Sequence, residues 1–111
     1  MIADTIRRMD PERARQRLAE ERARIDEELA RLRDQPSEDE QRDYGDQAAD
    51  LDQRERDEAI REELQDTLAA IERAERRLDD GSYGVSVVSG DPIPDDRLEL
   101  VPWADRKADE R

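Results

Sequence analysis

The chain has 111 residues, of which 48% are charged and 33% apolar, and its formal net charge is −13 at pH 7. So little apolar material cannot build the core of a compact enzyme, and the negative charge argues against a nucleic-acid or anionic membrane surface. Cys and His are both absent, which excludes disulfides, imidazole catalysis and the usual zinc sites, so we expect no enzymatic activity, no cofactor and no bound metal.

Residues 1–10 form an N-terminal segment that lacks the basic and apolar regions of a signal peptide. No stretch of the sequence approaches the ~20 apolar residues that span a bilayer. We therefore expect a cytoplasmic protein without a membrane partner.

A first helix is predicted from Pro11, because Asp10 can cap it and proline fits the first helical position. Oppositely charged residues four apart, Glu20 with Arg24 and Glu27 with Arg31, support this helix. Apolar residues recur on one side at spacings of three, four or seven, namely Ala14, Leu18, Ile25, Leu29 and Leu32.

Residues 34–47 lose the apolar stripe and contain Pro36 and Gly45, so the chain is expected to turn there. A second helix is predicted from about Ala48 to Asp79, before Gly81. Its apolar positions alternate in steps of four and three, as in a coiled-coil seam: Ile60, Leu64, Thr67, Ile71, Ala74 and Leu78. Two narrow stripes bury each other most simply in an antiparallel coiled-coil hairpin, which predicts a mainly α fold with residues 11–80 as the hairpin.

Residues 81–111 differ from the helical segments in composition, with an apolar run from Val85 to Trp103 that glycines and prolines interrupt. This pattern predicts a short β-ribbon or a compact irregular lobe. A last helical turn or two is expected in residues 104–111.

The negative charge is concentrated around the predicted turn. Residues 11–33 hold seven Arg and six acidic residues, for +1, whereas residues 34–52 hold eight acidic residues and one Arg, for −7. An acidic turn is often only a solubilising loop. At the end of a long rigid arm, it can also steer insertion into a basic cavity.

The segment Asp43-Tyr44-Gly45-Asp46-Gln47-Ala48 resembles the Asp-x-x-Asp-x-Ala tip motif of the DksA/TraR transcription factors. Residues 83–93 resemble that family's aromatic-Gly-x-Cys-x-x-Cys-Gly-x-x-Ile zinc-finger string, with serine at both cysteine positions, and the resemblance covers residues 10–111. It implies a regulator that enters the secondary channel of bacterial RNA polymerase, with Asp43, Asp46 and Ala48 at the active-centre tip.

The same resemblance implies that four zinc-ligand positions are changed, to Ser86, Ser89, Lys107 and Glu110. These residues are not ligands that hold a structural zinc ion, so the lobe is expected to fold without metal. The apolar run from Val85 to Trp103 is expected to stabilise the lobe in place of the zinc ion.

Family members also bind ppGpp, the alarmone of the stringent response, jointly with the polymerase. The resemblance aligns two of the basic positions used there with Ala70 and Val101, while Arg111 keeps a charge. Since a pentavalent anion would meet few cations, we do not expect ppGpp dependence.

Two alternatives stay open. A Gre-type factor also uses an acidic hairpin tip in the same channel, but carries a larger C-terminal domain than the residues after Asp80 can form. A structural or adaptor coiled coil would self-associate through its seam. The hairpin regulator is instead expected to be a monomer that makes no sequence-specific nucleic-acid contacts of its own.

Overall fold

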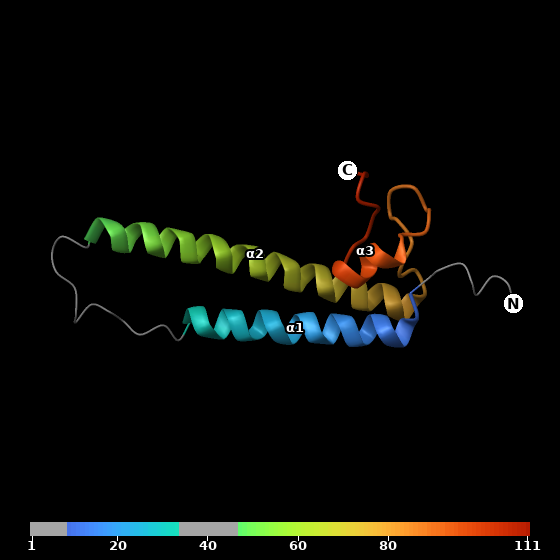
Figure 1. Cartoon of the computed structure of the whole chain (residues 1–111), viewed down its shortest axis with the longest axis horizontal. Coiled ribbons are helices and arrows are strands. Elements are labelled where there is room, and N and C mark those ends of the chain that lie inside the picture. The colour runs from blue at the N-terminus through green and yellow to red at the C-terminus, as the bar shows by residue number, and fades with distance from the viewer. Residues whose placement is uncertain (1–8, 34–46) are drawn as a thin grey trace, which may run out of the picture.

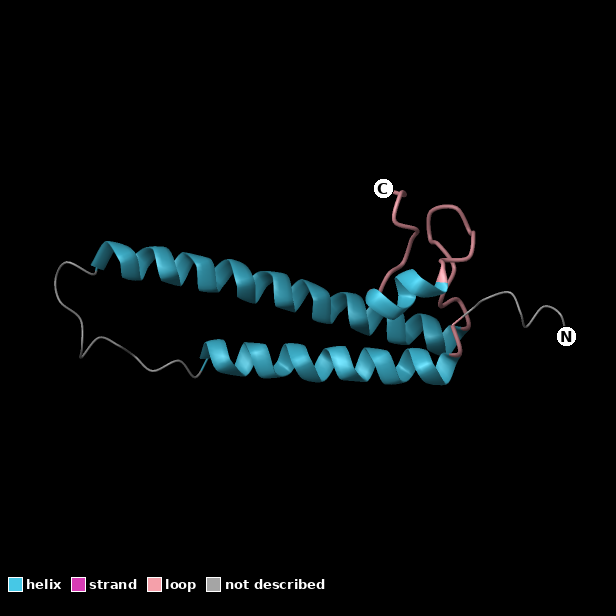
Figure 2. Cartoon of the chain, in the orientation of Figure 1, coloured by secondary structure: helices cyan, strands magenta, loops and turns pink. Residues whose placement is uncertain are grey.

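The computed structural model describes residues 9–33 and 47–111, which form two long antiparallel helices with a small lobe at one end (Figure 1). Helix α1 spans Pro11–Arg33, helix α2 spans Gln47–Asp80 and the short helix α3 spans Asp95–Leu100. These two stretches contain no strand (Figure 2), and the mainly α fold class is confirmed. None of the helices described in them is long and apolar enough to cross a bilayer.

Helix α1 begins at its predicted capping signal. The Asp10 carboxylate accepts a hydrogen bond from the Arg13 N–H at 3.3 Å, and the Asp10 carbonyl oxygen accepts one from the Ala14 N–H at 2.9 Å. These bonds satisfy N–H groups that the first helical turn leaves without intrahelical partners, and Pro11 has no N–H to satisfy. The predicted start at Pro11 is confirmed.

Helix α2 ends at a glycine cap. Gly81 has a φ of 84°, a left-handed conformation that glycine adopts without strain. The N–H groups of Ser82 and Tyr83 both donate to the Arg77 carbonyl oxygen, at 2.9 and 3.2 Å. The chain therefore turns back here, and the lobe lies beside the last turns of α2 (Figure 1).

The two long helices bury an apolar seam between them. Burying a leucine or isoleucine contributes ~1.5–3 kcal/mol, so this seam is the main source of hairpin stability. The fully buried members are Ala14, Leu18 and Ile25 of α1 with Ile71 and Ala74 of α2. Partly buried leucines extend the seam at positions 29, 64, 68 and 78.

Ion pairs across the seam show the register of the hairpin. They join Arg15 to Asp79 at 3.2 Å and Arg22 to Glu75 at 2.7 Å. Counting along both helices from these pairs puts the last residue of α1 opposite about residues 61 to 64 of α2. Helix α2 thus extends past α1 (Figure 1). The prediction that Ile60 belongs to the seam is therefore wrong, and its side chain is 44% exposed.

The ion pairs predicted within the first helix are also wrong in spacing. Long helical side chains lean toward the helix N-terminus, where residues three and four positions back are both neighbours. The carboxylates that Arg24 and Arg31 contact lie three residues back, on Glu21 and Glu28, each at 2.9 Å. They are not those of Glu20 and Glu27.

The lobe is held against the base of α1 by two arginines. The Arg17 guanidinium donates to the Glu99 carbonyl oxygen at 2.8 and 3.1 Å. Arg13 forms an ion pair with the Glu99 carboxylate at 2.9 Å. These contacts join the C-terminal end of α3 to the hairpin.

The interior of the lobe is small and irregular. Buried side chains of Tyr83, Ile93, Leu98 and Ala104 form its core. Burial raises the pKa of Tyr83 to about 12, and its hydroxyl donates to the Pro102 carbonyl oxygen at 2.7 Å. Its β-pairing in the described residues is one isolated bridge between Val85 and Pro92, so the irregular lobe is correct and the β-ribbon is not.

The lobe helix lies earlier than predicted. Residues 104–111 form no helix. Two of their carbonyl groups bind elsewhere in the lobe: the Asp105 carbonyl oxygen accepts from the Val87 N–H at 2.8 Å, and that of Arg106 accepts from the Arg97 guanidinium at 3.3 Å. Helix α3 instead follows Pro94, with acidic residues in its first turn. Helix α1 also begins at a proline, Pro11, with an acidic residue in its first turn, Glu12, although there Asp10 supplies a side-chain cap.

Candidate functional site

The predicted tip lies mostly outside the described part of the chain. Asp43 and Asp46 fall in the undescribed segment, and Ala48 belongs to the first turn of α2. The described residues next to the tip are the first turns of α2, which carry Asp50, Asp52 and a Leu51 side chain that is 56% exposed. They lie at the end of the hairpin farthest from the lobe (Figure 1).

The four positions that the resemblance equates with zinc ligands come together in the lobe as a hydrogen-bonded group: Ser86, Ser89, Lys107 and Glu110. One Glu110 carboxylate oxygen accepts from the Ser86 hydroxyl at 2.6 Å and from the Lys107 N–H at 2.7 Å. The Ser86 hydroxyl oxygen accepts from the N–H groups of Val88 and Ser89 at 3.1 and 3.2 Å.

The charge of Glu110 is stabilised by these donors. Hydrogen bonds from the hydroxyls of Ser86 and Ser89, and from the Lys107 backbone, lower the pKa of Glu110 to about 2. The Lys107 ammonium is turned to Asp91, at 3.0 Å. Two hydroxyls, one carboxylate and an ammonium do not fit zinc, which takes thiolate, imidazole and carboxylate ligands. Instead, the Glu110 carboxylate ties the loop at 86–89 to the C-terminal segment.

This arrangement predicts an acid-sensitive lobe. The folded-state pKa of Glu110 lies below the ordinary 4.5, so the unfolded chain binds more protons and the contribution of Glu110 to stability is lost as pH falls from about 4.5 to about 2. Glu110→Gln should destabilise the lobe at neutral pH and flatten this part of the pH profile, because a neutral amide oxygen accepts these hydrogen bonds more weakly than a charged carboxylate and does not titrate. Fluorescence of Trp103, the sole tryptophan, during denaturation measures this.

Asp109→Asn is the matched control, since Asp109 is an exposed neighbouring acid. It should behave as the wild type, and a chelator should change neither protein. Identical pH profiles for Glu110→Gln and the wild type would remove the proposed role of the carboxylate.

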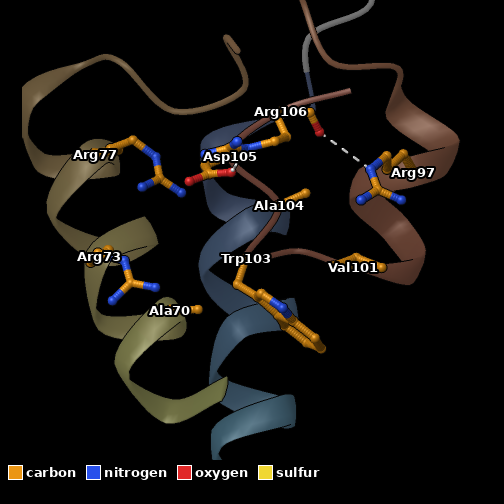
Figure 3. A pocket seen from close by; sticks show the side chains of 9 residues that line it. All are labelled: Ala70, Arg73, Arg77, Arg97, Val101, Trp103, Ala104, Asp105 and Arg106. Atoms are coloured by element: carbon orange, nitrogen blue, oxygen red, sulfur yellow. Dashed lines mark hydrogen bonds and ion pairs between the residues drawn. The ribbon is translucent and has the colours of Figure 1, made fainter. Parts of the chain in front are cut away.

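A second candidate site is a pocket of about 240 Å³ between α2 and the lobe, called here the arginine pocket (Figure 3). Arg73 and Arg77 extend from successive turns of α2 toward the segment that carries Asp105, and Arg97 of α3 lies on another wall. The complete lining is Ala70, Arg73, Arg77, Arg97, Val101, Trp103, Ala104, Asp105 and Arg106.

The charges in the arginine pocket are unevenly compensated. The Asp105 carboxylate forms an ion pair with Arg106 at 2.9 Å. The Arg77 Nη2 atom is shielded from solvent and has no hydrogen-bond partner in the described residues. Burial lowers the pKa of Arg77, and the positive charge of Arg73 acts in the same direction while Asp105 opposes it. The pocket is therefore lined by a partly desolvated guanidinium, whose charge Asp105 offsets only in part.

Ala70 and Val101, the uncharged residues that the resemblance aligns with basic positions of the family, both line this pocket. The expectation that an anion would meet few cations there is incorrect, because four arginines at other positions line the pocket. The ppGpp dependence itself stays open to measurement. The i, i+4 spacing of Arg73 and Arg77 was a sequence signal for paired like charges on one helix face.

Comparison with known proteins yields similarity in structure and sequence but no matching family model. The structure of the transcription factor DksA2 from Pseudomonas aeruginosa aligns with 87% of this chain and 73% of its own, with a TM-score of 0.64 and 32% sequence identity. The Bacillus subtilis (strain 168) protein YteA, described as uncharacterised, is 42% identical over 60 residues, 54% of this chain. General stress protein 16O of the same organism is 40% identical over 48 residues, 43% of this chain. The matched segments cover 25% and 29% of these two relatives.

Proposed function

Because the chain belongs to the family of the transcription factor DksA2, we propose that it is a non-enzymatic transcription regulator that binds bacterial RNA polymerase through the secondary channel and modulates initiation. The observation that carries this proposal is the 32% identity combined with a shared fold over 87% of the chain. A fold alone does not define a function, but here identity extends along the same residues as the fold.

The shape and charge of the hairpin support a probe that enters a channel. Helix α2 has 34 residues and is therefore ~50 Å long, and it extends past α1 at the end away from the lobe. The sequence 34–52, which connects the two helices and includes the first turns of α2, holds −7 of the net charge. Negative charge concentrated at one end of a rigid arm steers insertion into a basic cavity.

The proposed effectors are Asp43 and Asp46, with Ala48 beside them at the start of α2. Inside the channel, two carboxylates can act on the Mg²⁺ of the polymerase or on mobile elements near its active centre. In either case the regulator contributes charge and position and does not carry out a reaction itself.

Purified core polymerase provides the test of this proposal. Immobilised chain should retain the polymerase in a pull-down, because the hairpin and the lobe both contribute contact surface. A chain that binds no core polymerase would contradict the proposal.

The adaptor alternative makes a different prediction about size. The seam residues Leu18, Ile25 and Ile71 are already buried within one chain, so little apolar surface is left there for a second copy. Light scattering should therefore give the monomer mass of 12.9 kDa. A stable dimer that does not bind polymerase would favour the adaptor.

A further inference from the structure

Glu99, in the last turn of α3, is held by two arginines of α1 at once. The Arg13 guanidinium donates to both of its carboxylate oxygens, from Nε at 3.1 Å and from Nη2 at 2.9 Å. The Arg17 guanidinium donates to its backbone carbonyl oxygen, from Nε at 3.1 Å and from Nη2 at 2.8 Å. The two arginines are four residues apart and therefore lie on one face of α1. Arg13, Arg17 and Glu99 are called here the Glu99 clamp.

The Arg17 guanidinium is fixed along two of its edges. Its Nε and Nη2 atoms face α3, while its Nη1 atom donates to the carboxylates of Glu20 and Glu21 on its own helix, at 3.0 and 3.4 Å. The Arg17 side chain is only 15% exposed. The carbonyl oxygen that it binds belongs to the last turn of α3, where carbonyl groups lack intrahelical partners. Because a planar guanidinium held in this way has little freedom to turn, directional bonds specify how α3 lies on α1.

Other contacts between the lobe and the hairpin specify its orientation less closely. Buried side chains of both parts, such as Leu18 and Leu98, belong to one apolar core, and apolar burial is non-directional. The chain enters the lobe through Gly81 and Gly84, whose φ values are 84° and 85°. Glycine populates this region and many others at little cost, so the connection itself restricts rotation weakly. The Glu99 clamp adds the direction that burial and the connection lack.

The angle between lobe and hairpin matters because the predicted tip is far from the lobe. The first turns of α2 lie at the opposite end of a 34-residue helix (Figure 1). A rotation of ~10° at the base moves the far end of this ~50 Å helix by ~9 Å. An exposed ion pair contributes little to the free energy of unfolding, and the side chains of Arg13 and Glu99 are 45% and 41% exposed. The pair therefore affects where the tip lies more than whether the chain folds.

We propose that Arg13 and Arg17 are positioning residues, which hold the lobe at one angle to the hairpin through Glu99 and thereby set where the tip lies when the lobe contacts the partner. The inference rests on the proposed function, because the partner is then the polymerase. A chain whose lobe takes several angles binds only through the molecules that have the productive angle. Its apparent Kd rises by the reciprocal of their fraction.

Charge reversal tests the Glu99 clamp, with a control and a rescue. Arg13→Glu places a carboxylate opposite that of Glu99. Arg15→Glu is the matched control, because it makes the same charge change at an exposed arginine of α1 whose ion pair is with Asp79 of α2 and not with the lobe. Arg13→Glu/Glu99→Arg restores a pair of opposite charges with its polarity reversed. Arg17→Lys keeps the charge but loses the planar guanidinium that donates from two edges.

Spin labels on the free chain measure the angle without the polymerase. The chain contains no cysteine, so Glu62→Cys on α2 and Asp109→Cys in the lobe provide two unique attachment points. Both residues are exposed. Double electron-electron resonance then gives the distribution of distances between the two labels, and its width reports how many angles the lobe takes.

The label distances should follow the clamp and not the charge. They should be narrowly distributed in the wild type and in Arg15→Glu. They should broaden or shift in Arg13→Glu and in Arg17→Lys, and they should return to the wild-type distribution in Arg13→Glu/Glu99→Arg. All variants should melt within a few degrees of the wild type, because the ion pairs that they lose are exposed or the charge is kept.

Binding of core polymerase measures the consequence for the partner. Arg13→Glu should raise the Kd about threefold to tenfold, by the reciprocal of the fraction of molecules that keep the wild-type label distance. Arg15→Glu and Arg13→Glu/Glu99→Arg should bind within about twofold of the wild type.

Three outcomes would overturn the inference. One is an unchanged label distribution in both Arg13→Glu and Arg17→Lys. Another is a broadened distribution with unchanged Kd and promoter-complex lifetime, since the partner would then not depend on the angle. The third is loss of the folded lobe in these variants, seen in the fluorescence of Trp103, because the clamp would then maintain the fold and not the angle. A wild type that binds no polymerase would contradict the proposed function instead, while the label distances would still test the clamp.

Discussion

Replacing Ile71 with aspartate should unfold the hairpin and abolish polymerase binding at the same time. Ile71 is fully buried between α1 and α2. Truncation of a buried isoleucine costs ~2–5 kcal/mol, and an ionised carboxylate among apolar side chains adds to this loss. A change above about 4 kcal/mol is a large part of the 5–15 kcal/mol that stabilises a typical domain. Chemical denaturation followed by circular dichroism measures it.

Ile60→Asp provides the matched control for this experiment. It is the same substitution on the same helix, at a side chain that is 44% exposed beyond the end of α1. The free energy of unfolding should change by no more than about 0.5 kcal/mol, as is usual for surface substitutions, and polymerase binding should persist. Leu64→Asp, at a partly buried position, should fall between the two. Equal loss of stability at positions 60 and 71 would contradict the register of the hairpin.

The hairpin could be predicted from the sequence because its determinants are local. The cap at Asp10, the proline after it and the glycine at position 81 each act within one turn, and the apolar spacing of both helices survives in the buried seam. The failure at Ile60 has a different origin. Its spacing fits the seam, but only the length of α1 decides whether a partner lies opposite, and periodicity within α2 carries no information about that length.

The lobe was less predictable because long-range hydrogen bonds decide its structure. Ser86 and Glu110 are 24 residues apart, and no local pattern predicts that the carboxylate accepts from that hydroxyl. The arginine pocket likewise combines residues of α2, α3 and the C-terminal segment. Ala70 and Val101 lack the charges that the family resemblance leads one to expect at these positions, and arginines at other positions of the sequence line the same pocket.

Replacing Asp43 and Asp46 together with asparagine should remove the effect on initiation and leave both the fold and polymerase binding intact. Asparagine keeps the size and hydrogen-bonding capacity of aspartate and caps helices equally well, so stability should change by less than about 0.5 kcal/mol. Under the proposed function affinity should persist, because the flanks of the hairpin and the lobe would keep their contacts with the polymerase. The lifetime of promoter complexes, measured with and without each protein, should then match the value without any regulator.

The control variant Glu38→Gln/Glu40→Gln tests whether regulation depends on where the negative charges lie or only on how many there are. This variant also removes two negative charges from the segment 34–52, but it keeps the two aspartates that the family resemblance places at the tip. If the segment acts only through its summed charge, both double variants should lose activity equally, since steering depends on the total field. If Asp43 and Asp46 act at the active centre, the glutamine variant should associate more slowly and still regulate fully once bound. Full regulation by the asparagine variant would mean that the acidic segment only solubilises the turn, and the regulatory role would then have to lie elsewhere in the chain.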